Sequence, residues 1–170
     1  KNCRLHSDYA GDLINVKYAD SALVENCDLR GNDSFDSDAV DYDHLSGGII
    51  RNNIIYNFYG FNSDAIDLGE NSQNILIENN IIYNINDKGV SVGNGSGTVI
   101  KRNVIVNCGQ GIGVKDFNSY AYAEHNTFYG NQYGIATFVK NVGAGGGTAD
   151  VVNCIFARNS ISDYMADEQS

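Results

Sequence analysis

Hydrophobic and polar residues alternate along this 170-residue chain in many short stretches. Each apolar stretch is three to five residues long, as around Ile75 and Ile77. A period of two is typical of β-strands, and stretches this short do not favour helices. No apolar stripe of useful length recurs every 3.6 residues. The pattern therefore predicts an all-β protein.

The short stretches belong to a repeat that opens with asparagine followed by a small or apolar pair. The intervals between repeats are 24, 27, 27, 23, 23 and 27 residues, with the opening asparagines at Asn2, Asn26, Asn53, Asn80, Asn103, Asn126 and Asn153. Short strands at such a period predict a parallel β-solenoid in which each repeat forms one coil. We expect a single-stranded parallel β-helix of about seven coils.

The repeated asparagines have a physical reason to be there. Asparagine tolerates left-handed backbone angles, and stacked side-chain amides can hydrogen-bond from coil to coil. We therefore expect them to form turn ladders rather than a binding site, with a second column at Asn57, Asn84 and Asn107. One inward column is expected at Ile14 and Val16, Val40 and Tyr42, Ile66 and Leu68, Val90 and Val92, Ile112 and Val114, and Ile135. The next wall is expected to be filled by Ile54, Ile81, Val104 and Cys154.

Composition limits the classes of function. The chain has 11 Lys and Arg against 21 Asp and Glu, a net charge of −10, and it lacks proline and tryptophan. This charge disfavours nucleic acid and anionic membrane surfaces as partners. No apolar run approaches the roughly 20 residues of a transmembrane helix, so membrane insertion is not expected.

Residues 1–161 are predicted to form the solenoid and residues 162–170 a polar tail. The chain opens inside the repeat pattern, without an initiator Met or a signal peptide, so we expect it to be part of a longer protein. Open solenoid ends expose strand edges. Flanking domains or end-to-end self-association are therefore expected to cover them.

The four cysteines do not define a metal site. Cys3, Cys27 and Cys154 share a repeat position, Cys108 lies at a turn, and no zinc-type spacing occurs. The cysteines of the shared position can be small buried core residues. A disulfide between Cys3 and Cys27 is the alternative, because the two are neighbours in successive coils.

Carboxylates gather on one predicted strand face of the second and third coils. They are Asp38, Asp41, Asp43, Asp64 and Asp67, with His44 and Glu70 beside them and Lys88, Lys115 and Asp116 one or two coils further on. Like charges at strand spacing repel each other and call for a cation, a basic partner or raised pKa values. Three interpretations stay open. The acids Asp38, Asp41, Asp64 and Asp67 bind Ca²⁺; the cluster pairs internally with the lysines as a solvated face; or two acids hydrolyse a glycoside.

The asparagine ladder, strand length and period resemble those of right-handed parallel β-helix repeat proteins of the pectate lyase-like superfamily. The resemblance covers essentially the whole chain. In polysaccharide lyases of this superfamily, the corresponding face binds an acidic sugar through Ca²⁺, and a Lys or Arg removes the proton next to the carboxylate. The resemblance implies Lys88 or Lys115 as the base and Asp64 and Asp67 among the calcium ligands. Substrate contacts are assigned to Asp41, Ser91, Asp116 and His44.

Two classes of function follow from these observations. The first is a secreted β-helix module that interacts with carbohydrate, lyase-like and acting on uronic-acid polymers with calcium. The second is a non-catalytic structural or adhesive solenoid of a surface protein. Both place the chain outside the cell, at the cell surface or in the periplasm, with a polysaccharide as the expected partner of the first.

Overall fold

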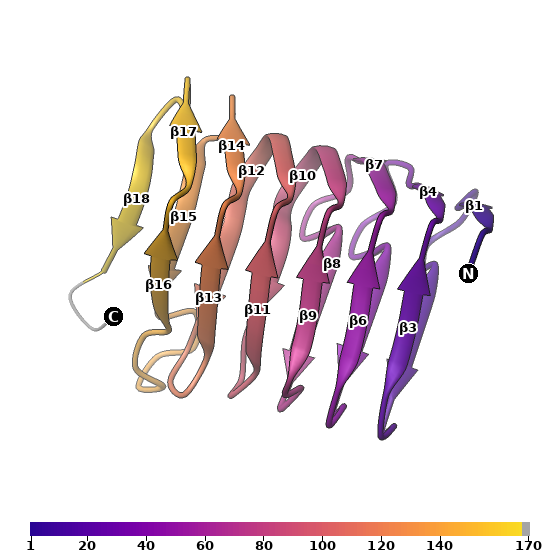
Figure 1. Ribbon diagram of the computed structural model, residues 1–170, viewed down its shortest axis with the longest axis horizontal. Helices are drawn as coiled ribbons and strands as arrows, with labels where there is room; N and C mark the ends of the chain where they lie inside the picture. Colours follow the sequence, from indigo (N-terminus) through magenta and orange to yellow (C-terminus); the bar gives the residue numbers. More distant parts are fainter. Residues whose placement is uncertain (168–170) are drawn as a thin grey trace.

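The computed structural model describes residues 1–167, and this part of the chain consists of β-strands and turns without a helix. Strands of each coil pair in parallel with those of the next, which produces a rod with three faces (Figure 1). One face holds six strands, so the rod makes about six full turns where the repeat predicted about seven. The expected parallel solenoid is confirmed.

Each face is a column of stacked strands. The first face contains β2 (Ile14–Lys17), β5 (Val40–Asp43), β8 (Ile66–Glu70), β15 (Tyr133–Phe138) and β18 (Ser162–Ala166). The second contains β3 (Ala22–Glu25), β6 (Gly48–Arg51), β9 (Ile75–Glu78), β11 (Gly97–Lys101), β13 (Tyr120–Glu124) and β16 (Thr148–Val152). The third contains β1 (Arg4–His6), β4 (Asp28–Arg30), β7 (Ile54–Phe58), β14 (Thr127–Tyr129) and β17 (Ile155–Ala157). Two long strands, β10 (Ile81–Val92) and β12 (Val104–Lys115), pass round the corner from the third face to the first.

The core lies between the three faces, and the inward column of the first face is confirmed. Its central members are completely buried: Val40, Tyr42, Ile66, Leu68, Val90, Val92, Ile112, Val114 and Ile135. Ile14 and Val16 are partly buried and pack against this core at the N-terminal end. Because these side chains point inward, the residues between them point out and form the surface of the first face.

On the third face the predicted inward residues are wrong by one position. Ile54, Ile81 and Val104 are 42%, 47% and 40% exposed, whereas the residues that follow them, Ile55, Ile82 and Ile105, are fully buried. The reason is the preceding asparagine. It turns inward itself, so strand alternation places the next residue outside and the one after it inside. Cys154 packs against the core as expected.

We expected one asparagine column to provide both the left-handed turns and the amide ladder, but two neighbouring columns provide them separately. Residues of the first column have a left-handed backbone, with φ between 51° and 57°. They are Asn2, Asn26, Asn52, Asn79, Arg102, His125 and Asn153. The amide ladder falls on the next column, where Asn53, Asn80, Asn103 and Asn126 are buried and each of the first three donates to the next amide oxygen at 3.0 Å. Asn2, Asn26 and Asn153 are therefore not in the column of Asn53, as we had expected.

The other asparagine column is confirmed as a ladder. The amide of Asn84 donates to Asn57 at 3.0 Å, and that of Asn107 donates to Asn84 at 2.7 Å. All three residues have positive φ. They mark the corner between the third and the first face.

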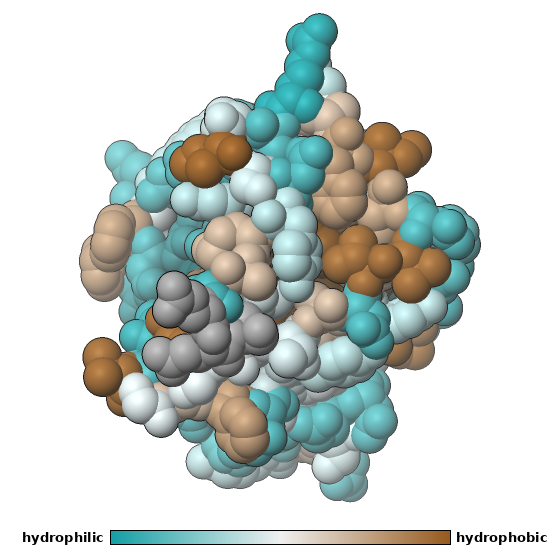
Figure 2. Space-filling model, turned by 90° about the vertical axis from the view of Figure 1, so that its left-hand side faces the viewer, coloured by the Kyte–Doolittle hydropathy of each residue, from teal (hydrophilic) through white to brown (hydrophobic). Residues whose placement is uncertain are grey.

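The C-terminal segment continues the solenoid further than predicted. Residues Ser162–Ala166, which we assigned to a polar tail, form β18 and pair in parallel with β15. The last three residues of the expected tail lie outside the described residues. Seen from this end, apolar side chains reach the surface in several separate places (Figure 2). Exposed apolar residues in the last part of the chain include Val142, Ile155 and Ile161.

Candidate functional site

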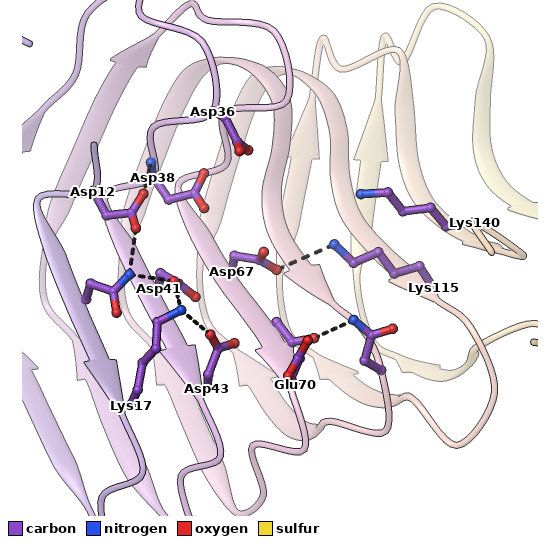
Figure 3. A pocket seen from close by; sticks show the side chains of 13 residues that line it. Asp12, Lys17, Asp36, Asp38, Asp41, Asp43, Asp67, Glu70, Lys115 and Lys140 are labelled. Carbon is purple, nitrogen blue, oxygen red and sulfur yellow. Dashed lines mark hydrogen bonds and ion pairs between the residues drawn. The ribbon is translucent and has the colours of Figure 1, made fainter. Parts of the chain in front are cut away.

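A polar pocket of about 390 Å³ opens on the outer surface of the first face (Figure 3). Its walls come from successive coils, and every lining residue except one glycine is polar or charged. They are Asp12, Asn15, Lys17, Asp36, Asp38, Asp41, Asp43, Asp67, Gly69, Glu70, Asn94, Lys115 and Lys140. Seven carboxylates thus face three lysines, so the pocket is acidic.

One edge of the pocket is a ladder of aspartates that bind backbone N–H groups of the next coil. Asp12 accepts from the backbone of Asp38 at 2.9 Å, and Asp38 accepts from that of Asp64 at 2.6 Å. Asp64 in turn accepts from the backbone of Lys88 at 2.8 Å. Burial and the nearby charge of Asp64 raise the pKa of Asp38 to about 9. This carboxyl is therefore protonated at neutral pH.

A second group on the pocket floor surrounds Asp41. Its Oδ2 accepts a hydrogen bond from Asn15 at 2.8 Å and lies 3.5 Å from the Lys17 ammonium, which also contacts Asp43 at 2.5 Å. Burial and the charge of Asp43 raise the pKa of Asp41 to about 6. Hydrogen bonding to Asp43 raises the pKa of Lys17, so this lysine stays charged.

Lys115 reaches the pocket from β12 across a glycine. An added Cβ at Gly93 would lie 2.4 Å from Lys115 Cε, so the lysine side chain runs directly over this bare position. The Lys115 ammonium ends 3.6 Å from Asp67 Oδ1 (Figure 3), and the lysine is only 5% exposed. This Asp67 oxygen accepts no hydrogen bond from any described residue. The sequence brings Asp67 and Lys115 together as predicted.

Lys88 does not line the pocket. It is buried beside Asp64 and Asp87, at 3.4 Å and 2.5 Å from their carboxylate oxygens. Burial lowers the pKa of Lys88, but the charges of Asp64 and Asp87 outweigh this effect and leave the pKa raised. Burial raises the pKa of Asp64 to about 7 against the opposing effect of Lys88. Lys88 and Asp64 therefore hold coils together beneath the surface.

The other predicted substrate contacts lie outside the pocket lining. Asp116 is buried and binds the backbone N–H groups of Lys140 and Asn141 at 2.7 and 2.9 Å. Ser91 is fully buried, and its hydroxyl has no partner among the described residues. His44 stacks on Tyr18 with ring centroids 4.6 Å apart. Asp41 is the one predicted substrate contact that lines the pocket.

The four predicted calcium ligands do not converge. Within residues 1–167, no three Asp, Glu, His or Cys side chains form a group that could hold a metal ion. Oxygens of Asp38 and Asp64 accept backbone N–H groups, and Asp41 contacts Asn15 and Lys17. The residues as arranged do not fit a preformed calcium site, so calcium stays a prediction and no chemical step is derived through it.

Asp36 and Lys140 also line the pocket, although they were not among the predicted site residues. Asp36 precedes β5 with a positive φ and binds the amide of Asn62. Lys140 lies in the loop after β15, and its backbone is fixed by Asp116. Neither residue lies in a strand column, so strand spacing carries no signal for them.

Comparison with known protein families agrees with this architecture. A family model described as "Right handed beta helix region" matches residues 1–161. Among solved structures, the chain is similar to the mannuronan C-5 epimerase AlgE4 A-module of Azotobacter vinelandii, with 15% identity, a TM-score of 0.46, and coverage of 91% of this chain and 56% of that one. It is also similar to the periplasmic alginate epimerase AlgG, with 14% identity, a TM-score of 0.41, and coverage of 88% and 48%. The chain thus spans about half the length of these two structures. No curated protein matches it in a sequence comparison.

Proposed function

The chain belongs to the right-handed beta helix family, and from this premise we propose that it is a carbohydrate-interacting module whose acidic pocket holds a saccharide. The observation that carries the proposal is the pocket lining. Carboxylates, amides and ammonium groups from successive coils line one opening, and apolar side chains do not contribute. Such a lining matches the hydroxyl groups of a sugar, which donate and accept hydrogen bonds.

Protonation gives the pocket both kinds of hydrogen-bonding carboxyl. With a pKa of about 9, Asp38 offers a donor O–H at neutral pH. Asp41, with a pKa of about 6, is mostly an acceptor there. Lys17 and Lys115 add charged donors on either side of the carboxylates. A saccharide that spans neighbouring coils would find alternating donors and acceptors at strand spacing.

In its finer form the proposal is a lyase-like reaction on a uronic-acid polymer, with Lys115 as the base. Lys115 supports this role better than Lys88, because it lines the pocket while Lys88 is held in buried ion pairs. Lys115 would first give its ammonium proton to solvent, and the neutral amine would take the proton next to the sugar carboxylate. The electrons of that C–H bond would form a double bond, the bond to the leaving sugar oxygen would break, and this oxygen would take up a proton from solvent. The seven carboxylates would repel an anionic polymer unless protonation or an added cation such as Ca²⁺ neutralised part of their negative charge.

The non-catalytic solenoid is the second candidate, and the aspartate ladder favours it. The carboxylates of Asp12, Asp38 and Asp64 each bind a backbone N–H of the next coil. Acids engaged in this way stabilise stacking whether or not a ligand binds. In both cases we propose a location outside the cytoplasm and a polysaccharide or surface component as the partner.

The test is a calorimetric titration of the protein with neutral, amino-sugar and uronic-acid oligosaccharides, each with and without calcium. We expect binding that weakens at least about tenfold in Lys115→Ala and Asp41→Asn. The matched control is Lys101→Ala on the second face, which contacts Glu78 and lies outside the pocket. Absence of binding throughout the panel would overturn the proposal. Ultraviolet absorbance of an unsaturated product in the uronic-acid arm would support the lyase, and a flat trace beside measurable binding would favour the non-catalytic module.

A further inference from the structure

Two thiols meet at the N-terminal end of the rod. Cys3 and Cys27 precede the paired residues Arg4 and Asp28, so they occupy the same position in successive coils. Their Sγ atoms are 3.1 Å apart, and both cysteines are free thiols. The pair lies in the corner between the second and third faces, where the following strand begins.

This position belongs to the buried amide column. Its members are Cys3, Cys27, Asn53, Asn80, Asn103, Asn126 and Cys154. From Asn53 onward, side-chain amides link each coil to the next. Cys27 still receives support, because its backbone N–H donates to Asn53 Oδ1 at 2.9 Å. Between the first two coils, the thiol pair of Cys3 and Cys27 takes the place of this amide link.

We propose that Cys3 and Cys27 form a disulfide that joins the first coil to the second where the amide ladder ends. In-register neighbours on adjacent coils are about 4.8 Å apart, which lies inside the range of Cα separations that disulfides span. The two sulfurs need to approach by only about 1 Å to bond. Neither cysteine lies within a strand, so the approach does not distort a paired segment.

The thiol pair borders an open groove, with Cys3 partly exposed and Cys27 4% exposed. They line a groove of about 570 Å³ together with Asn2, Arg4 and Asn26. Burial raises the pKa of the Cys27 thiol, but hydrogen bonds from Cys3 outweigh this effect and leave it below the ordinary value. A lowered pKa favours the thiolate, which is the form that attacks disulfides.

The oxidant we name is a small-molecule disulfide such as oxidised glutathione. A thiolate of this pair attacks one of its sulfurs, forms a mixed disulfide and releases one thiolate. The other cysteine of the pair then attacks the cysteine sulfur of the mixed disulfide, closes the bond and releases the second thiolate. The two cysteines lose two electrons and two protons, and the reagent is reduced to two thiols that take up both protons.

The other two cysteines provide the contrast. Cys108 is buried, donates to the carbonyl of Val106, and has a pKa raised by burial to about 12. Cys154 lies in the same column at the far end of the rod, beside Asn126. Neither has a cysteine neighbour among the described residues, so only one pairing is expected.

The test is to incubate the whole chain with oxidised glutathione, count the free thiols and map disulfides by mass spectrometry. We expect thiols to fall from four to two per chain, with one cross-link between Cys3 and Cys27. Hydrogen exchange of β1 should slow by about tenfold on oxidation and recover with reductant. Cys3→Ser should abolish both effects, and Cys154→Ser, the matched control, should leave them intact. Four remaining thiols, a different pairing, or a stable mixed disulfide at Cys3 or Cys27 would each overturn the proposal.

Discussion

Asp64 and Lys88 contact each other twice through one oxygen atom. The backbone N–H of Lys88 donates to Asp64 Oδ1 at 2.8 Å, and the Lys88 ammonium lies 3.4 Å from the same oxygen. Both residues are 3% exposed. One carboxylate thus satisfies both a backbone group and a charge of the next coil beneath the pocket.

Removing this carboxylate should destabilise the rod strongly. Asp64→Ala leaves the Lys88 backbone N–H without its acceptor and leaves the buried ammonium with Asp87 alone. We expect a loss of about 3 kcal/mol in the free energy of unfolding. Asp64→Asn keeps the backbone acceptor and should lose less. Urea denaturation followed by circular dichroism measures both, and equal losses would contradict the role of the backbone contact.

The same substitution should cost much more stability in one asparagine column than in the other. Asn80→Gly removes the acceptor of two Asn53 donors and the donor to the Ile50 carbonyl, all buried, so a loss of about 3 kcal/mol is expected. Asn79→Gly removes one contact with Arg102 and retains the left-handed backbone that glycine adopts readily, so the loss should stay below about 1 kcal/mol. Comparable unfolding curves for the two variants would refute the division of roles.

Stability should fall as pH rises from about 4 to about 9. Asp38, Asp41 and Asp64 have folded-state pKa values of about 9, 6 and 7, above the ordinary 3.8. The folded chain therefore holds protons that the unfolded chain has lost in this window. Their contribution is complete below pH 3.8 and disappears as pH rises through the folded values.

Urea denaturation at several pH values across the window measures this slope. Asp38→Asn keeps the acceptor for the Asp64 backbone N–H but cannot titrate. The decline in its free energy of unfolding should flatten above about pH 7. A variant that declines as steeply as the parent chain would argue against a protonated Asp38.

Gly93→Ala should disturb the pocket without unfolding the rod. The added methyl would collide with Lys115 Cε and lie 2.9 Å from its Cγ, so the whole lysine side chain would have to move aside. We expect a stability change below about 1 kcal/mol. Saccharide binding should weaken, because Lys115 would leave its position beside Asp67. Unchanged affinity in a variant shown to be folded would mean that Lys115 does not set the binding geometry.

The first face could be predicted from sequence because its inward positions carry hydrophobic residues in every coil from β2 to β12. Alternation around Val40 and Tyr42 leaves one possible register. On the third face, Asn53 is followed by two isoleucines, and the pattern does not say which one points inward. The burial of the asparagine decides it, and that burial depends on amide contacts with neighbouring coils.

The sequence predicted which strand face carries the candidate site, but it did not predict the contacts that its side chains make. Spacing brought Asp41, Asp67 and Lys115 to one surface. It did not show that Asp38 and Asp64 bind backbone N–H groups, because this depends on how side chains meet the coil stacked on them. Lys88 and Lys115 differ for a similar reason. Lys88 runs over Gly113 into buried ion pairs, and Lys115 runs over Gly93 to the pocket.

Gly69 and Gly93 face outward where other coils present larger side chains. The Asp43 carboxylate lies against Gly69 and the Lys115 side chain lies over Gly93, so these bare positions let charged side chains fold across the strands that form the pocket. A ligand would meet a recess that is already formed and would lose little energy in reshaping it. The pocket is also sensitive to insertions, because strand alternation decides which residues face outward. One extra residue in β8 before Asp67 would turn Asp67 to the interior and expose an aliphatic neighbour instead.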